Sequence, residues 1–337
     1  MWPIAIVVLL LCALSAALAW GGPRAPPALA SVSQPWAEVD FADLPAPRTL
    51  RARDGTALSC RTYTARGTVT ELGVGASTAQ RTIVLIHGSS GRSENLHVLA
   101  RALAAAGFVV HVPDVRGHGE SGTRGQIDYV GQLEDDLEDC RRALVPSGPV
   151  DLAGFSAGGG FVLRFAADPR RTLFDHYLLL APFFSQTAPT YRPASGGWVS
   201  VGLPRIVALA LLNRLGIRAL NRLPVTAYAL PAGARDRLTP WYGYALAMNF
   251  RPHDDYRADI RAATQPLAVL VGDDDDQFYA ERFDAVFRAA GRAVPVGRVL
   301  HTGHLGLTLS APGVRAVVDT LVGLHTGTPG PTLGASP

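Results

Sequence analysis

The stretch Gly154-Phe155-Ser156-Ala157-Gly158 places a serine between two glycines, after a short apolar run and before a helix-like segment. In that context a strand turns sharply into a helix and lifts the serine hydroxyl above the carboxyl edge of a sheet. Glycine on both sides removes side chains that would clash in so tight a turn. The pattern therefore predicts that Ser156 is a nucleophile for acyl transfer. The alternative is a turn of small residues that packs a helix on a strand.

A serine nucleophile requires a base, and the base requires a carboxylate that fixes its tautomer. Residues 273–276 are four consecutive aspartates after an apolar strand-like run, and His304 follows the last such run. The chain order serine, aspartate, histidine is the order found in α/β-hydrolases. Four carboxylates this close cannot all be buried together, so at least two should face water. We expect one of these aspartates and His304 to complete a triad, with His301 as the alternative base.

Two backbone amides are expected to stabilise the oxyanion of the reaction. The loop 87–91 follows a strand-like run and contains Ser89, and Ala157 comes directly after the nucleophile. In an α/β-hydrolase these two positions supply the oxyanion hole. His87 and His118 precede glycines in nearby loops, and we expect them to hold those loops by hydrogen bonds. The scattered histidines and the absence of an H-x-x-x-H or Cys/His cluster predict no metal site, and no cofactor is predicted.

Apolar runs alternate with helix-like segments along most of the chain, which predicts an α/β protein with a parallel sheet covered on both faces. The expected strands are 49–53, 58–64, 82–86, 108–112, 150–153, 177–181, 266–271 and 296–300, and the expected helices are 96–106, 129–144, 158–167, 278–290 and 314–324. Asp54-Gly55 predicts a hairpin between the first two strands. After Pro182 the alternation breaks, which indicates an insertion over the strand ends.

From about Arg48 to Leu324 the chain resembles the monoacylglycerol lipase and lysophospholipase-like group of α/β-hydrolases. The resemblance rests on the serine motif, on the loop 114–122 and on Gly303-His304-Leu305-Gly306. It implies an α/β-hydrolase fold with a mostly parallel eight-stranded sheet and a helical cap insertion. In that group the acid lies three residues after the glycine that ends the strand, which selects Asp275, with Asp274 and Asp276 as the alternatives.

These patterns divide the chain into six expected parts. They are a signal peptide or membrane anchor (1–20), a linker (21–47), the first part of the hydrolase core (48–184), the cap (185–256), the second part of the core (257–325) and a disordered tail (326–337).

The function predicted from this resemblance is hydrolysis of carboxylic esters, with monoacylglycerol or lysophospholipid-like lipids as substrates. A small-molecule esterase, a thioesterase, an amidase and an acyltransferase use the same triad and stay open as alternatives. A non-catalytic binding protein on the same scaffold normally lacks part of the triad. The net charge of +3 comes without a basic block, so no nucleic-acid partner is predicted.

Residues 2–20 carry no charge and are mostly Ala, Leu, Ile and Val, which is typical of a signal peptide or a single membrane span. Ala17-Leu18-Ala19 favours cleavage, whereas the missing Lys or Arg at the start favours a retained anchor. The expected location is therefore the bacterial cell envelope, membrane-anchored or exported. In the exported part, Cys60 and Cys140 predict either one disulfide or two unpaired core thiols.

Overall fold

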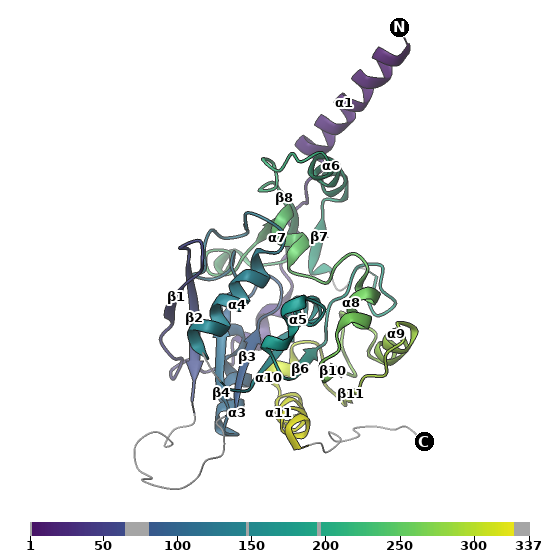
Figure 1. Cartoon of the computed structure of the whole chain (residues 1–337). Coiled ribbons are helices and arrows are strands. Elements are labelled where there is room, and N and C mark those ends of the chain that lie inside the picture. The colour runs from purple at the N-terminus through teal and green to yellow at the C-terminus, as the bar shows by residue number, and fades with distance from the viewer. Residues whose placement is uncertain (1, 65–80, 146–147, 194–196, 327–337) are drawn as a thin grey trace.

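The protein consists of an α/β core, a cap above it and an N-terminal helix that projects from the cap (Figure 1). The computed structural model describes residues 2–64, 81–145, 148–193 and 197–326. The whole architecture places the carboxyl ends of the parallel strands beneath the cap.

The core sheet has eight strands in the order β1-β2-β4-β3-β5-β6-β10-β11. The pairs β1–β2 and β2–β4 are antiparallel, and the other neighbours are parallel. This topology confirms the predicted mostly parallel eight-stranded sheet. Its strands are β1 (Arg48–Arg51), β2 (Ala57–Tyr63), β3 (Thr82–Ile86), β4 (Val109–Pro113), β5 (Val150–Phe155), β6 (Tyr177–Leu180), β10 (Leu267–Gly272) and β11 (Val296–Val299).

Helices cover both faces of the sheet. The helices α4 and α5 lie on one face, and α3 packs with α11 on the other (Figure 1). All residues of β3, β5, β6 and β10 are buried, as expected for apolar strands between two helical layers. The core helices are η2 (Ser93–Leu96), α3 (His97–Ala105), α4 (Gln132–Leu144), α5 (Ala157–Ala166), η3 (Pro169–Leu173), α8 (Tyr256–Ala262), η6 (Ala280–Arg282), α9 (Phe283–Ala289), α10 (Gly306–Leu309) and α11 (Ala311–Thr326).

The cap differs from the helical insertion that the sequence predicted, because it contains a three-stranded antiparallel sheet. The Leu- and Ala-rich composition favoured helices, whereas the strands come from short runs of β-branched and aromatic residues that pair with one another. The cap elements are β7 (Val199–Val201), α6 (Leu203–Arg214), β8 (Pro224–Tyr228), η5 (Ala232–Ala234), β9 (Trp241–Gly243) and α7 (Tyr244–Asn249).

The helix α1 (Trp2–Trp20) is the one helix among the described residues that is long and apolar enough to cross a membrane. It contacts α6 at the outer end of the cap, beside which Figure 1 shows it. Leu14 and Leu18 of α1 pack near Leu209 and Leu212 of α6. A signal sequence has the same length and composition, so this finding leaves anchor and signal both open.

Residues 21–47 were expected to be a linker without packed elements. In the structure they contain α2 (Ala30–Ser33) and η1 (Gln34–Trp36), and Val32, Pro35 and Trp36 line a cavity in the core. Linker composition did not reveal this packing, because the surface that receives these residues comes from distant parts of the chain.

The remaining sequence expectations concern the cysteines and the tail. Cys60 and Cys140 are buried free thiols in one small apolar cluster. Of the two expectations, a disulfide or two unpaired core thiols, the structure shows the second. Thr326, the first residue of the expected disordered tail, is the last residue of α11. Residues 327–337 lie outside the described part of the chain.

Candidate active site

Ser156 occupies a strained turn between β5 and α5. Its backbone has φ 56° and ψ −118°, a conformation that side-chain-bearing residues rarely adopt. A Cβ at Gly158 would lie 2.3 Å from the His87 carbonyl oxygen, and one at Gly154 would lie 2.4 Å from the Gly158 carbonyl oxygen. Both glycines are therefore required by close backbone approach, which is the reason that the sequence pattern suggested.

The Asp275 carboxylate holds His304. Asp275 is 1% exposed, and its Oδ2 lies 2.8 Å from His304 Nδ1. Its Oδ1 accepts hydrogen bonds from the backbone amides of Gln277 and Phe278, at 2.8 and 2.9 Å. The His304 ring packs against Phe155 and Phe278, with centroid distances of 4.7 and 5.2 Å. These contacts fix the ring orientation and leave Nε2 as the nitrogen available for proton transfer.

The other candidates for acid and base lie elsewhere. Asp273 forms an ion pair with Arg298 at 3.4 Å. Asp274 and Asp276 are exposed and line the cavity in front of His304. His301 is exposed and is absent from the described lining of that cavity. Of the four aspartates, Asp275 is the one that is both buried and bonded to an imidazole.

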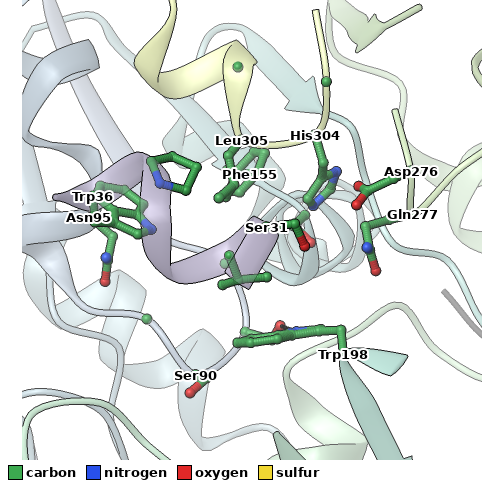
Figure 2. Close-up of a pocket in the computed structure, with 18 of the residues that line it drawn as sticks. Ser31, Trp36, Ser90, Asn95, Phe155, Trp198, Asp276, Gln277, His304 and Leu305 are labelled. Carbon is green, nitrogen blue, oxygen red and sulfur yellow. Dashed lines mark hydrogen bonds between the residues drawn. The ribbon is translucent and has the colours of Figure 1, made fainter. Parts of the chain in front are cut away.

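Ser156 and His304 face a common cavity of about 380 Å³. The Ser156 hydroxyl makes no hydrogen bond to another described residue, and catalytic hydrogen bonds are often loose before substrate binds. Figure 2 shows His304, Asp276 and Gln277 on one side of this cavity, Trp36 and Asn95 on the opposite side, and Trp198 below. The structure thus brings the predicted nucleophile, base and acid to one opening.

The loop 87–91 is fastened to the cap. The Ser90 amide donates to the Tyr242 hydroxyl at 2.5 Å, and the Ser90 hydroxyl donates to the Thr239 carbonyl at 2.7 Å. The amides of Ser89 and Ala157 donate no hydrogen bond to another described residue, and both residues line the space beside Ser156. Ala157 begins α5, so its amide also lies at the positive end of the helix dipole.

His87 and His118 are fully buried supports of this loop. His87 Nε2 accepts the Val115 amide hydrogen at 3.1 Å, so Nδ1 donates to the Gly88 carbonyl at 2.8 Å. The Tyr242 hydroxyl lies 2.6 Å from His118 Nε2. Burial lowers the pKa of both imidazoles. Neutral rings with these partners hold the loop, in the role expected from the sequence.

A second cavity, of about 220 Å³, begins at Ser156 and Ala157 and extends into the cap. Its described walls are mainly apolar side chains of the cap and the adjoining loops, among them Phe183, Val201, Ile206, Met248 and Phe250. Ser89, Ser156 and Trp198 line both cavities, whereas His304 lines the first one.

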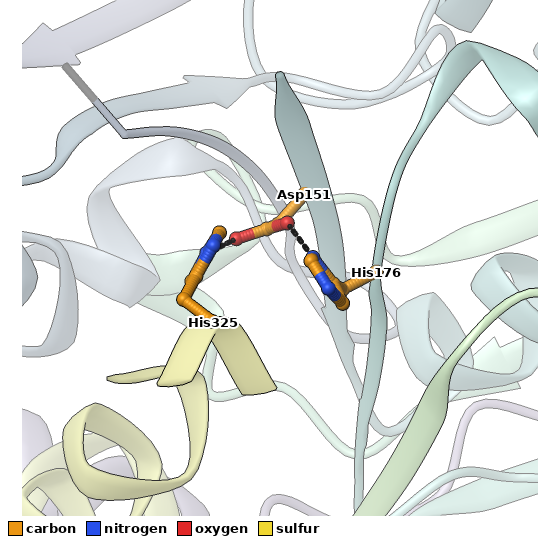
Figure 3. Close-up of side chains that lie close together, drawn as sticks. All are labelled: Asp151, His176 and His325. Atoms are coloured by element: carbon orange, nitrogen blue, oxygen red, sulfur yellow. Dashed lines mark hydrogen bonds and ion pairs between the residues drawn. The ribbon is translucent and has the colours of Figure 1, made fainter. Parts of the chain in front are cut away.

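Asp151, His176 and His325 form a cluster whose oxygen and nitrogen atoms could hold a metal ion, since all lie within 4.8 Å of one another. However, each imidazole bonds a different oxygen of the buried Asp151 carboxylate: His176 Nδ1 at 2.8 Å and His325 Nε2 at 2.5 Å (Figure 3). This is the geometry of a hydrogen-bonded cluster that ties α11 to β5. The sequence did not reveal it, because the three residues are far apart in the chain.

The serine aminopeptidase S33 family matches residues 77–294 of the chain, which is more than half of its 337 residues. The chain belongs to this family. It is a serine hydrolase with the α/β-hydrolase fold, and the resemblance inferred from the sequence is thereby confirmed.

Relatives of this S33 hydrolase include lipases. A monoacylglycerol lipase of Mycolicibacterium smegmatis is 34% identical over 91 residues, which cover 25% of this chain and 32% of that protein. A soluble variant of Saccharomyces cerevisiae monoglyceride lipase has a TM-score of 0.57 at 15% identity, covering 84% of this chain and 96% of its own. A bacterial membrane phospholipase A has a TM-score of 0.55 at 16% identity, covering 96% and 99%. At these identities the two structures show the fold alone.

Several residues of the S33 hydrolase site were missed from the sequence. They include Val32 and Trp36, which line the first cavity, and Tyr242, which holds the loop 87–91. The aromatic side chains of Trp36 and Phe41, within a stretch rich in Pro and Ala, were the available signal that residues 21–47 pack against something.

Proposed function

We propose that this serine hydrolase cleaves carboxylic esters of monoacylglycerol-like lipids through Ser156, His304 and Asp275. The observation that carries the proposal is the buried Asp275 carboxylate, which holds His304 beside the cavity that Ser156 also lines. A carboxylate in this position fixes the imidazole tautomer and stabilises the imidazolium that forms during the reaction.

In the first half of the reaction, Ser156 Oγ attacks the ester carbonyl while His304 Nε2 takes its proton. The amides of Ser89 and Ala157 donate to the oxyanion of the tetrahedral intermediate. His304 then gives the proton to the oxygen of the leaving alcohol as the bond between this oxygen and the carbonyl carbon breaks. The acyl group remains bound to Ser156. Water attacks this acyl-enzyme in the same way and releases the carboxylic acid.

The second cavity supports an acyl chain as the acid part of the substrate. It starts at the nucleophile and is lined mainly by aliphatic and aromatic side chains. Such a surface binds hydrocarbon through the hydrophobic effect. Lysophospholipid-like esters carry a similar chain, so they belong to the same proposal and are distinguished by assay.

The proposal includes a membrane location. The apolar helix α1 packs on α6 of the cap, and two residues of α6, Leu203 and Ile206, also line the second cavity. A retained α1 would hold the enzyme at the surface of the bacterial envelope membrane, where its substrates are dissolved. A cleaved α1 would release the same enzyme as an exported protein.

The test is hydrolysis of an ester panel by the full chain and by its Ser156→Ala variant. The panel runs from short p-nitrophenyl esters to long-chain monoacylglycerols and lysophospholipids, with a matched amide and a matched thioester. We expect Ser156-dependent turnover that increases with acyl length and a loss of several orders of magnitude in the variant. Activity confined to short esters, to the amide or to the thioester would replace the lipase assignment, and unchanged turnover in Ser156→Ala would refute the mechanism.

A further inference from the structure

Residues 21–47, called the strap below, are fixed at both ends. At the upstream end, the Arg205 backbone amide of α6 donates to the Gly21 carbonyl at 3.4 Å, and the Arg205 guanidinium donates to the Leu18 and Ala19 carbonyls at the end of α1, at 2.8 and 2.9 Å. At the downstream end, the Asp43 carboxylate lies 3.1 Å from His97 Nε2 and 3.3 Å from the Arg101 guanidinium. The strap therefore runs from the cap to α3 of the core.

Between these ends the strap crosses the first cavity. The Leu29 amide donates to the Ala229 carbonyl of the cap at 3.3 Å, and α2 and η1 follow directly. Val32, Pro35 and Trp36 then form one wall of the cavity that contains Ser156 and His304. Figure 2 shows this segment across the cavity, with Trp36 on the side opposite His304.

The chemistry of ester cleavage decides which part of a substrate lies against the strap. His304 must reach the leaving oxygen to protonate it, so the alcohol part lies in a space that His304 borders. The first cavity borders His304, whereas the described lining of the second cavity contains Ala157 and no His304. The acyl part therefore occupies the second cavity, and the alcohol part occupies the first.

The charges around the first cavity restrict the alcohol further. Asp274 and Asp276 are exposed carboxylates in its wall, and no arginine occurs in its described lining. Neither carboxylate forms an ion pair with a described residue, and two such negative charges raise the free energy of a bound anion such as a phosphate monoester. Phe155, Trp36 and Trp198 give the remaining wall an aromatic, apolar character.

Resting on the proposed function and narrowing its substrates to monoacylglycerol-like esters, we infer that the strap is a wall of the leaving-group site and that Trp36 selects esters of uncharged, partly apolar alcohols. The strap thus makes the segment after α1 part of the substrate site. Acyl-chain selection belongs to the separate cavity in the cap.

The experiment compares ratios of kcat/KM within two series of esters, using the full chain. One series keeps the acyl chain and changes the alcohol from methanol to 2-naphthol, and the other keeps the alcohol and changes acyl length. Trp36→Ala should lower the naphthyl-to-methyl ratio about tenfold, equivalent to about 1.4 kcal/mol, and leave the acyl-length ratio unchanged. Trp36→Phe should restore most of the alcohol ratio.

Two controls separate the strap from the cap and from general damage. Val201→Phe, in the wall of the second cavity, should lower the long-to-short acyl ratio and leave the alcohol ratio unchanged. Gln34→Ala, at an exposed strap position outside the described lining, should change neither ratio. An unchanged alcohol ratio in Trp36→Ala, or a changed acyl ratio instead, would overturn the inference.

The charge argument has its own measurement. Asp274→Asn combined with Asp276→Asn should raise kcat/KM for lysophosphatidate relative to monoacylglycerol of the same chain several-fold, because two negative charges leave the site. An unchanged ratio would overturn the assignment of uncharged alcohols.

Binding to a Ser156→Ala background keeps these results distinct from the proposed function. Adding Trp36→Ala should weaken binding of the naphthyl ester about tenfold and binding of the methyl ester much less. This result would support the role of the strap in the leaving-group site even if another residue were the nucleophile. If Trp36→Ala left the affinity for the naphthyl ester unchanged, the role of the strap would be contradicted even if Ser156 is the nucleophile.

Discussion

Both oxygens of the Asp275 carboxylate have hydrogen-bond partners, and this separates it from its three aspartate neighbours. One oxygen faces His304 Nδ1, and the other accepts two backbone amides in the turn after β10. The amides hold the carboxylate in one orientation, so that the histidine is held as well. Asp274 and Asp276 project to solvent from the same turn.

Asp275→Asn should lower kcat/KM by about 10³–10⁴-fold, because an amide at this position favours the wrong imidazole tautomer. Asp274→Asn is the matched control, and it should change hydrolysis of a neutral ester by less than about fivefold, since an exposed charge near the site is worth little. Steady-state kinetics on one long-chain ester checks both. Equal losses in the two variants would show that the assignment of the acid is wrong.

For single residues, the sequence pointed to the candidate nucleophile and base but did not decide which aspartate is the acid. The motif around Ser156 and the loop around His304 have local signatures, because the tight turn and the strand end impose glycine nearby. The choice among residues 273–276 depends on which carboxylate the turn buries, and burial is a property of the folded chain. For the same reason Tyr242 and Trp36 could not be chosen from their neighbours in sequence.

The loop 87–91 and the cap strand β9 form one hydrogen-bonded unit. The Tyr242 hydroxyl accepts the Ser90 amide hydrogen and donates to His118 Nε2. Both partners of this hydroxyl lie in a buried site, so its removal leaves the Ser90 amide and His118 Nε2 without this hydrogen bond. The adjacent Ser89 amide, proposed for the oxyanion hole, depends on the same loop.

Tyr242→Phe should reduce kcat more than it raises KM, since misplaced oxyanion donors act in the transition state, and should lower the free energy of unfolding by about 1–3 kcal/mol. Tyr177→Phe is the matched control, because its buried hydroxyl donates to the Arg171 carbonyl on a different part of the core. That variant should lose similar stability and keep kcat. Urea unfolding and steady-state kinetics test the pair, and a kcat loss common to both would contradict the loop's role.

The Asp151 cluster links the last helix to the sheet. His325 of α11 and His176 before β6 bond the same buried carboxylate of β5 (Figure 3). The hydrogen bond to Asp151 raises the pKa of His176, against the lowering effect of its partial burial. A raised folded pKa contributes stability below the unfolded pKa, and this contribution is lost as pH rises through the folded value.

Asp151→Asn should therefore lower the free energy of unfolding most near pH 6, by about 1.5–3 kcal/mol, and less at pH 9. The loss is larger near pH 6 because the charged hydrogen bond between His176 and Asp151 exists when His176 is protonated. Urea titrations of the wild type and the variant at both pH values give the two differences. His176→Gln should show little of this pH dependence, and a difference that grows toward pH 9 would contradict the account.

Periodicity predicted the core elements well, whereas the cap and the strap required the structure. The strands β3, β6 and β10 lie within a residue or so of their predicted bounds, because buried strands are continuous apolar runs. The strands β7 and β9 are three residues long and are stabilised by pairing across the cap. Such pairings are non-local, so no window of sequence contains them.

At the scale of the whole molecule, core, cap and strap meet at Ser156. The parallel strand ends carry Ser156 and the other residues of the proposed triad, the cap provides most of the second cavity, and the strap after α1 lines the first. Because α1 packs on α6 and leads directly into the strap, the apolar N-terminal helix is joined to a segment that lines the first cavity.

The most direct test of the central claim is labelling with a fluorophosphonate, which bonds covalently to an activated serine oxygen. The account predicts one phosphonyl group per chain on the peptide that contains Ser156, no such adduct in Ser156→Ala, and much slower labelling in a His304→Gln variant. Mass spectrometry of digested protein locates the adduct. A label on another serine, or labelling of Ser156→Ala at the wild-type rate, would contradict the account.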